Sequence, residues 1–192
     1  EVIKQAAISA IAAGKTRYTA PHGIPELRKA IADWFEREFG LKYESKQVTV
    51  SSGVKQGLFH LMLATVGEGD EVIIPSPYWV SYPEMVRISG GDPVVLPSDG
   101  RFRLDIDLIR SKLNDRTRLI ILNSPNNPSG GMYSRDELEQ LARVLEGTSV
   151  LVASDEIYSS LVYDGAEFVS FATLSPDAYK HTITFNGLSK SH

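Results

Sequence analysis

The sequence predicts an α/β fold with three layers, helix, sheet and helix, around a mostly parallel mixed sheet. Stretches with apolar residues at helical spacing alternate with short β-branched runs, which is the pattern of crossover units around a parallel sheet. No Gly/Ser-rich or Pro-rich linker interrupts the 192 residues. We therefore expect one continuous domain body.

Helices are predicted where apolar residues recur at helical spacing. The first thirteen residues show that spacing, so the chain opens inside or just before a helix. Ser134 and Glu137 form a capping-box pattern that fixes the start of one helix. The five further predicted helices cover residues 24–39, 55–66, 82–89, 106–113 and 134–145.

Strands are predicted at short runs rich in β-branched residues, each bounded by turn residues. The six predicted strands cover residues 47–50, 71–74, 93–96, 118–122, 150–153 and 182–185. Ligands of open α/β sheets bind at the carboxyl ends of the strands, so the loops that follow these runs are the candidate functional segments.

Composition excludes several classes of function. Twenty basic and twenty-four acidic residues give a net charge of −4, and no dense Lys/Arg run favours nucleic acid. The absence of cysteine excludes disulfides and thiolate metal sites and makes the cytoplasm the expected location. The apolar runs are too short to cross a membrane. The four histidines do not show the paired spacing of metal ligands, so we expect no metal site. They are His22, His60, His181 and His192.

The loop before the predicted helix at residues 55–66 reads Ser51-Ser52-Gly53-Val54-Lys55. Free amides at a helix start favour an anion such as phosphate. A serine N-cap is the alternative, and for this loop alone it is the more common arrangement. Neither G-x-G-x-x-G nor G-x-x-x-x-G-K-[ST] occurs in the chain, which disfavours a dinucleotide or nucleoside triphosphate.

Two further loops carry unusual residues. Residues 75–82 hold three large aromatic side chains, one of which could stack on a flat ring, although aromatic residues more often fill a core. Residues 123–130 hold three asparagines, more turn-forming residues than a strand-to-helix link needs. A plain turn remains open for this second loop.

Asp155 follows a predicted buried strand, where a carboxylate is costly unless a cation or hydrogen-bond donors meet it. A helix-capping role is equally open for Asp155. Lys190 follows the predicted strand 182–185 in a glycine-containing turn at the same edge of the sheet. Composition alone favours an ordinary surface lysine there.

Together these loops resemble the large domain of the fold-type I pyridoxal-phosphate enzymes, specifically the class I/II aminotransferases, and are most similar to bacterial aspartate-aminotransferase-like members. The resemblance covers nearly the whole chain. The matching segments are Tyr18 within residues 18–28, Gly53-Val54-Lys55, residues 75–85, the turn Asn127-Pro128-Ser129-Gly130, Asp155 with Tyr158, and Ser189-Lys190.

The resemblance implies transfer of an amino group between an L-amino acid and a 2-oxo acid, with pyridoxal 5′-phosphate as cofactor. Lys190 would form the Schiff base with the cofactor and shuttle the proton. Asp155 would keep the pyridine nitrogen protonated. Asn127 and the Tyr158 phenol would donate to the phenolate oxygen of the ring. Lys190, Asp155 and Tyr158 are thus the expected catalytic residues.

The resemblance also implies the other cofactor contacts. Trp79 would lie on the ring, and the amides of Gly53, Val54 and Lys55 would bind the phosphate. Tyr18 would resemble the tyrosine that reaches the phosphate of the neighbouring subunit, which implies a homodimer with shared active sites.

Two departures from the family pattern limit these expectations. Many relatives carry a serine phosphate ligand where this chain has Gly187, so that contact is either absent or replaced by Ser189. The family's arginines for the phosphate and for the substrate α-carboxylate would lie past position 192. We therefore expect residues 1–192 to form most of the cofactor-binding large domain, without the small C-terminal domain and the N-terminal arm, and to transaminate poorly alone.

Three alternatives stay open at this point. β-Lyases, decarboxylases and synthases share the scaffold and the cofactor. A non-catalytic aminotransferase-like sensor joined to a DNA-binding segment would use the cofactor as a signal. A plain nucleotide-binding domain is disfavoured by the missing phosphate-loop motifs.

Overall fold

The computed structural model describes residues 1–98, 100 and 102–191. The chain divides into two compact units, which are described separately. The N-terminal unit comprises Glu1–Glu38 and Lys42–Val50, and the sheet unit comprises Phe39–Leu41 and Ser51–His192.

The N-terminal unit is helical. It contains α1 (Val2–Ala12), nearly all of α2 (Pro25–Phe39) and the short 3₁₀ helix η1 (Ser45–Gln47). The expected helix at the start of the chain is confirmed. α1 has no buried residue, whereas α2 buries Ala32 and Phe35. The Phe35 ring packs edge-on against Tyr43, with 5.4 Å between centroids.

The predicted strand at residues 47–50 is wrong. The backbone groups of this segment bind partners in the N-terminal unit and no neighbouring strand. Arg28 Nε donates to the Val48 carbonyl at 2.9 Å, and Val50 N donates to the His22 carbonyl at 3.0 Å. Because these groups are taken, the segment is extended but unpaired.

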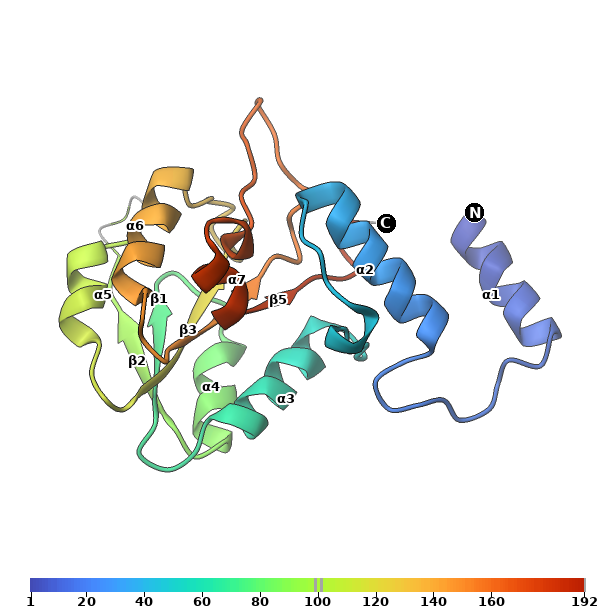
Figure 1. The fold of residues 1–192 in the computed structure, drawn as a ribbon, viewed down its shortest axis with the longest axis horizontal. Coiled ribbons are helices and arrows are strands. Elements are labelled where there is room, and N and C mark those ends of the chain that lie inside the picture. The colour runs from blue at the N-terminus through green and yellow to red at the C-terminus, as the bar shows by residue number, and fades with distance from the viewer. Residues whose placement is uncertain (99, 101, 192) are drawn as a thin grey trace. The chain divides into compact units, whose positions relative to one another are not determined.

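The sheet unit is built on five strands in the order β2-β1-β3-β4-β5 (Figure 1). The strands are β1 (Glu71–Pro75), β2 (Asp92–Leu96), β3 (Thr117–Asn123), β4 (Leu151–Asp155) and β5 (Thr182–Phe185). All four pairings are parallel, so the antiparallel member of the expected mixed sheet does not occur among the described strands. The strand ends are in register, with Asn123 opposite Asp155 and Asp155 opposite Phe185.

Helices cover both faces of this sheet, which confirms the three-layer expectation. On one face, α3 (Val54–Thr65) and α4 (Ser81–Ile88) pack on Val72, Ile74 and Ile121. On the other, α5 (Ile106–Lys112), α6 (Arg135–Leu145) and α7 (Pro176–His181) pack on the alternate residues of the same strands. The period-two alternation of buried side chains along each strand therefore feeds two separate cores.

Most predicted elements agree with the structure to within one or two residues. The strand at residues 182–185 is exact, and the capping box of Ser134 and Glu137 is confirmed at the start of α6. α7 and the 3₁₀ helix η2 (Phe171–Thr173) were not predicted. α7 has only six residues, too few to show a helical period, although Ser175 caps it and Pro176 begins it.

None of the helices in the described residues is long and apolar enough to span a bilayer.

Candidate active site

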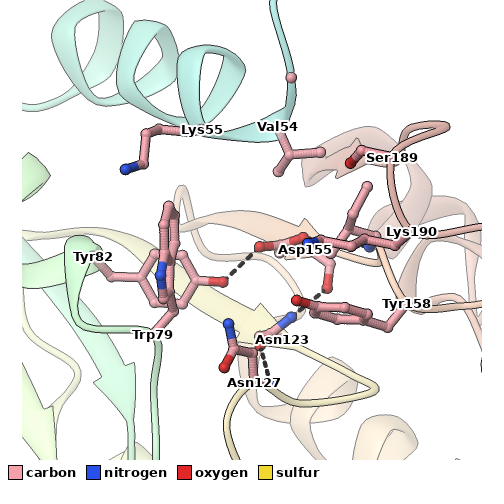
Figure 2. Close-up of a pocket in the computed structure, with 12 residues that line it drawn as sticks. Val54, Lys55, Trp79, Tyr82, Asn123, Asn127, Asp155, Tyr158, Ser189 and Lys190 are labelled. Carbon is pink, nitrogen blue, oxygen red and sulfur yellow. Dashed lines mark hydrogen bonds between the residues drawn. The ribbon is translucent and has the colours of Figure 1, made fainter.

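A pocket of about 280 Å³ lies at the carboxyl ends of β3 and β4 (Figure 2). All of its lining residues belong to the sheet unit. Nine of the residues predicted from the sequence line it: Gly53, Val54, Lys55, Trp79, Asn127, Asp155, Tyr158, Ser189 and Lys190. Tyr82, Asn123 and Ile157 also line it and were not among the predicted site residues.

Tyr18 is the one predicted site residue outside this pocket. It lies in the N-terminal unit, and its side chain is fully exposed. Its expected contact with a neighbouring subunit therefore stays a prediction. Of the four histidines, position 192 lies outside the described residues. The described part of the chain contains no group of three His, Asp or Glu side chains that could hold a metal.

The start of α3 presents backbone amides without a side-chain cap. Gly53 is the N-cap residue, with a φ of 82° that favours glycine, and no side chain caps the helix. Ser51 Oγ instead donates to the Gly53 carbonyl at 2.9 Å, and Ser52 N donates to Gln56 Oε1 at 2.6 Å. The serine N-cap considered for this loop is thus wrong, and the positive end of α3 faces the pocket.

Trp79 forms one side of the pocket. It is half-buried and packs edge-on against Tyr82, with 5.5 Å between ring centroids. Lys55 Nζ lies 4.9 Å from the centroid of the Trp79 ring, within reach of a cation–π contact. The aromatic loop therefore contributes to both the core and the site, because Tyr82 is buried in the core while Trp79 lines the pocket.

Asp155 ends β4 and is 4% exposed. Tyr82 Oη donates to Asp155 Oδ2 at 2.6 Å, and Ile157 N donates to Oδ1 at 3.4 Å. Burial raises the pKa of Asp155, and the two hydrogen bonds oppose that rise. No basic side chain of the described residues forms an ion pair with this carboxylate, although Lys55 and Lys190 line the same pocket.

Asn123 holds the loop that presents Asn127. Its Nδ2 donates to the Asp155 carbonyl at 3.0 Å, and its Oδ1 accepts from Asn127 N at 2.7 Å. Because Asn123 is 4% exposed, these bonds form away from water. The loop is therefore more than a turn: it is hydrogen-bonded to the end of the strand that carries Asp155.

The segment that leads to Lys190 is fixed by Asn186. Asn186 Nδ2 donates to the Glu156 carbonyl at 3.1 Å and to Ser159 Oγ at 2.9 Å. Lys190 Nζ lies 6.0 Å from the centroid of the Tyr158 ring. The Lys190 side chain is exposed, but it lines the pocket.

Gly187 lies close to Ile157 and Val54, which line the pocket. A Cβ at this position would lie 3.2 Å from Ile157 Cδ1 and 3.8 Å from Val54 Cγ2. A side chain at residue 187 would thus point toward the start of α3, as a phosphate ligand would need. Ser189 lines the same pocket and is drawn near Val54 in Figure 2.

Gly57 sets the approach of α3 to β5. A Cβ at residue 57 would lie 3.1 Å from Phe185 Cε1 and 3.1 Å from Ser51 Oγ. The absence of a side chain lets the helix contact the last residue of the strand that leads to Lys190.

Glu156 is a second buried acid next to Asp155, and the sequence reasoning missed it. It is 2% exposed, and its Oε1 accepts from Ser154 Oγ and Ser170 Oγ, each at 2.8 Å. Its Oε2 has no hydrogen-bond partner among the described residues. Burial raises the pKa of Glu156 to about 7. Two consecutive acids after a buried strand were the available signal.

The chain resembles known proteins along its whole length. It is 48% identical to the aspartate/prephenate aminotransferase of Cereibacter sphaeroides and 42% identical to an aspartate aminotransferase of Bacillus sp., with 99% of the chain aligned in each case. It superposes on the crystal structure of the Rhizobium meliloti aspartate aminotransferase with a TM-score of 0.95 and 46% identity over 98% of the chain.

The chain covers 48% of the Cereibacter and Rhizobium proteins, so it spans about half the length of these relatives. The sequence profile of the family described as aminotransferase class I and II matches residues 1–192. This match and the close likeness in sequence and fold show that the chain belongs to the class I and II aminotransferase family.

Proposed function

We propose that the complete protein is a pyridoxal-phosphate-dependent aminotransferase that moves an amino group between an L-amino acid and a 2-oxo acid. The observation that carries this proposal is the buried Asp155 carboxylate, which lines the same pocket as the Lys190 amine and has no cationic partner among the described residues. Family membership supports the same assignment.

The donor set of the pocket fits the cofactor group by group. A protonated pyridine nitrogen would give Asp155 the cation that it lacks. The uncapped amides at the start of α3 suit a phosphate, and Ser189 lies at the same pocket. Asn127 and Tyr158 would donate to the phenolate oxygen, and Trp79 offers an aromatic face to the ring.

When bound, pyridoxal phosphate supplies an electron sink next to the substrate amine. The rest of the chemistry belongs to the side chains. Lys190 Nζ would hold the cofactor and, once released, would move the proton between the substrate Cα and the cofactor C4′. Asp155 keeps a proton on the ring nitrogen. Tyr158 and Asn127 stabilise negative charge on the ring oxygen.

The substrates and the assembly are further parts of the proposal. Aspartate with 2-oxoglutarate is the first pair to assay, because the relatives are named aspartate aminotransferases and the Thermus thermophilus relative is described with maleate, a dicarboxylate. We propose a cytoplasmic homodimer in which Tyr18 reaches the neighbouring subunit's phosphate. The substrate α-carboxylate would be bound by a small domain outside residues 1–192, so these residues alone would transaminate poorly.

The test uses the full-length protein loaded with pyridoxal phosphate. Borohydride reduction followed by peptide mass spectrometry should place the cofactor on Lys190, and incubation with aspartate and 2-oxoglutarate should yield oxaloacetate and glutamate in equal amounts. Lys190→Ala should abolish the adduct and lower kcat by at least about 10³-fold. Lys180→Ala, at an exposed lysine of α7, is the matched control and should change neither.

Labelling of another lysine, or an unchanged adduct in Lys190→Ala, would overturn the assignment of Lys190. Release of ammonia without transfer to 2-oxoglutarate would identify a lyase on the same scaffold. Cofactor binding without turnover of any amino acid would identify a sensor.

A further inference from the structure

The hydrogen bond between Tyr82 and Asp155 joins two segments 73 residues apart. Tyr82 lies in the first turn of α4, its side chain is 1% exposed, and its hydroxyl reaches Asp155 Oδ2 at 2.6 Å (Figure 2). Among Leu58, Met62 and Met85, a phenylalanine would fill the core as well as this tyrosine does. Its hydroxyl therefore calls for a separate explanation.

We infer that Tyr82 is a positioning residue that acts through Asp155, holding the carboxylate in its charged form and leaving Oδ1 to meet the ring nitrogen of the cofactor. This inference rests on the proposed function. Oδ2 is occupied by the Tyr82 hydroxyl, whereas Oδ1 has only the long 3.4 Å bond from Ile157 N. Each carboxylate oxygen can accept more than one hydrogen bond, and Oδ1 is the one whose existing bond is long and weak, so it is the better placed to accept from the ring nitrogen.

The chemistry of the donor matters. A lysine or arginine against Asp155 would neutralise it and compete with a protonated pyridine. A phenol stabilises the negative charge by hydrogen bonding and adds no charge of its own. Burial and the neighbouring carboxylate raise the pKa of Tyr82, so the phenol stays protonated and remains a donor.

The direction of the effect follows from the same bond. Burial raises the pKa of Asp155, and the Tyr82 hydrogen bond lowers it. Without the hydroxyl, Asp155 would hold a proton more readily, and a proton shared with a pyridine nitrogen would move toward the carboxylate. The ring would then be a weaker electron sink.

Other titratable groups lie near Asp155 and must be controlled for. Lys55, Tyr158 and Lys190 line the same pocket, and Glu156 follows in the chain. Of the described side chains, Tyr82 is the one that hydrogen-bonds the Asp155 carboxylate. Substitution at residue 82 is therefore the direct test.

The experiment compares full-length wild type with Tyr82→Phe and with 3,5-difluorotyrosine incorporated at residue 82. Difluorination makes the phenol a stronger donor while keeping its shape. In the cofactor-free protein, a ¹³C NMR titration of Asp155, assigned with Asp155→Asn, should show a higher pKa in Tyr82→Phe and a lower one in the difluoro variant. With ¹⁵N-labelled pyridoxal phosphate bound, the ring nitrogen of Tyr82→Phe should be less protonated than in wild type.

Tyr82→Phe should also lower kcat about 10- to 100-fold, as expected for loss of a hydrogen bond to a charged group. Tyr163→Phe, which removes the hydroxyl of an exposed tyrosine outside the pocket, is the control and should move none of these readouts. An equal Asp155 pKa in all three proteins would overturn the inference, and so would an unchanged ring-nitrogen signal in Tyr82→Phe. If Tyr82→Phe does not fold, the difluoro variant still decides.

The outcome is separable from that of the proposed function. If the wild-type protein forms the Lys190 adduct and transaminates, but the pKa of Asp155 does not depend on residue 82, only the role of Tyr82 is contradicted. If the wild-type protein does not form the adduct, the proposed function itself is contradicted.

Discussion

Acidic side chains at the two ends of the parallel sheet have different kinds of partner. At the amino end of β1, Glu71 is 7% exposed and pairs with Arg116, while Asn114 Nδ2 donates to it at 2.8 Å. The preceding Asp70 pairs with Arg118 at 3.0 Å. At the carboxyl end of β4, Asp155 and Glu156 are met by hydroxyl groups and no cation of the described residues.

The difference separates structural acids from acids kept for a ligand. A buried acid with an arginine and an amide has its charge balanced within the fold, and removing one partner of such a pair destabilises the protein. A buried acid whose hydrogen-bond donors are all uncharged keeps a negative charge or a proton that the fold does not need. The carboxyl end of the sheet therefore carries a cost in stability that binding of a positively charged group would offset.

The sharpest way to break this comparison is to neutralise one acid at each end. Asp155→Asn in the full-length protein should lower kcat by about 10²- to 10⁴-fold, because the ring nitrogen loses its anionic partner. The cofactor-free form should be as stable as wild type or more so, because a desolvated acid is removed while Tyr82 keeps an acceptor. Steady-state kinetics and urea unfolding provide the two measurements.

Glu71→Gln is the counterpart at the other end. It should leave kcat unchanged and lower the free energy of unfolding by about 1–3 kcal/mol, because Arg116 loses its charged partner. If Asp155→Asn unfolded the protein and Glu71→Gln abolished activity, the two ends would have the reverse roles.

The contribution of Glu156 can be tested through the pH dependence of the free energy of unfolding. Its folded-state pKa is raised to about 7 from an ordinary value of 4.5, so the folded protein holds this proton where the unfolded chain has released it. Stability should therefore fall as pH rises through that window. Glu156→Gln should remove this part of the decline, a difference of roughly 3 kcal/mol between pH 4.5 and pH 8.

Thermal unfolding of both proteins across this pH range, without cofactor, measures the Glu156 effect. Asp155, whose pKa is also raised, contributes a decline of the same sign in both proteins. Because the Asp155 charge is also one cause of the raised pKa of Glu156, the difference between the two curves includes this interaction. Parallel stability curves for wild type and Glu156→Gln would show that Glu156 ionises without cost.

The smallest effect is expected at Asp70. The hydrogen bond from Arg118 lowers the pKa of Asp70, so its stabilising effect is present above pH 3.8 and is lost as pH falls through the lower folded-state value. Because the pair is partly exposed, Asp70→Asn should cost no more than about 1 kcal/mol at neutral pH. Wild type and variant should become equally stable in acid, as urea unfolding at the two pH values would show.

The strands show which elements can be predicted from the local sequence pattern. The strands at residues 71–74 and 182–185 were predictable because β-branched runs bounded by turn residues leave little choice of structure. The same reasoning failed at residues 47–50, where contacts with Arg28 and His22 decide the structure. Those partners lie 20 and 28 residues away, beyond the reach of any local signal.

The carboxyl end shows a different limit. Asp155, Asn127 and Lys190 were found through their place after strands and the resemblance to a family, and the fold brings all three to one pocket. Tyr82 was visible as an aromatic residue, but its bond to Asp155 depends on how α4 packs on the sheet. Glu156 was visible as the second of two consecutive acids, but its burial is a property of the assembled core.

The missing side chain at Gly57 has a consequence for related sequences. Since α3 contacts Phe185 through this residue, a methyl group there would push the phosphate-facing amides away from the segment that ends in the reactive amine, with every functional side chain still present. An alignment that checks only for the lysine, the aspartate and the tyrosine would classify such a chain as competent. Judging a homologue therefore requires reading a residue that has no chemistry of its own, because it sets the spacing between groups that do.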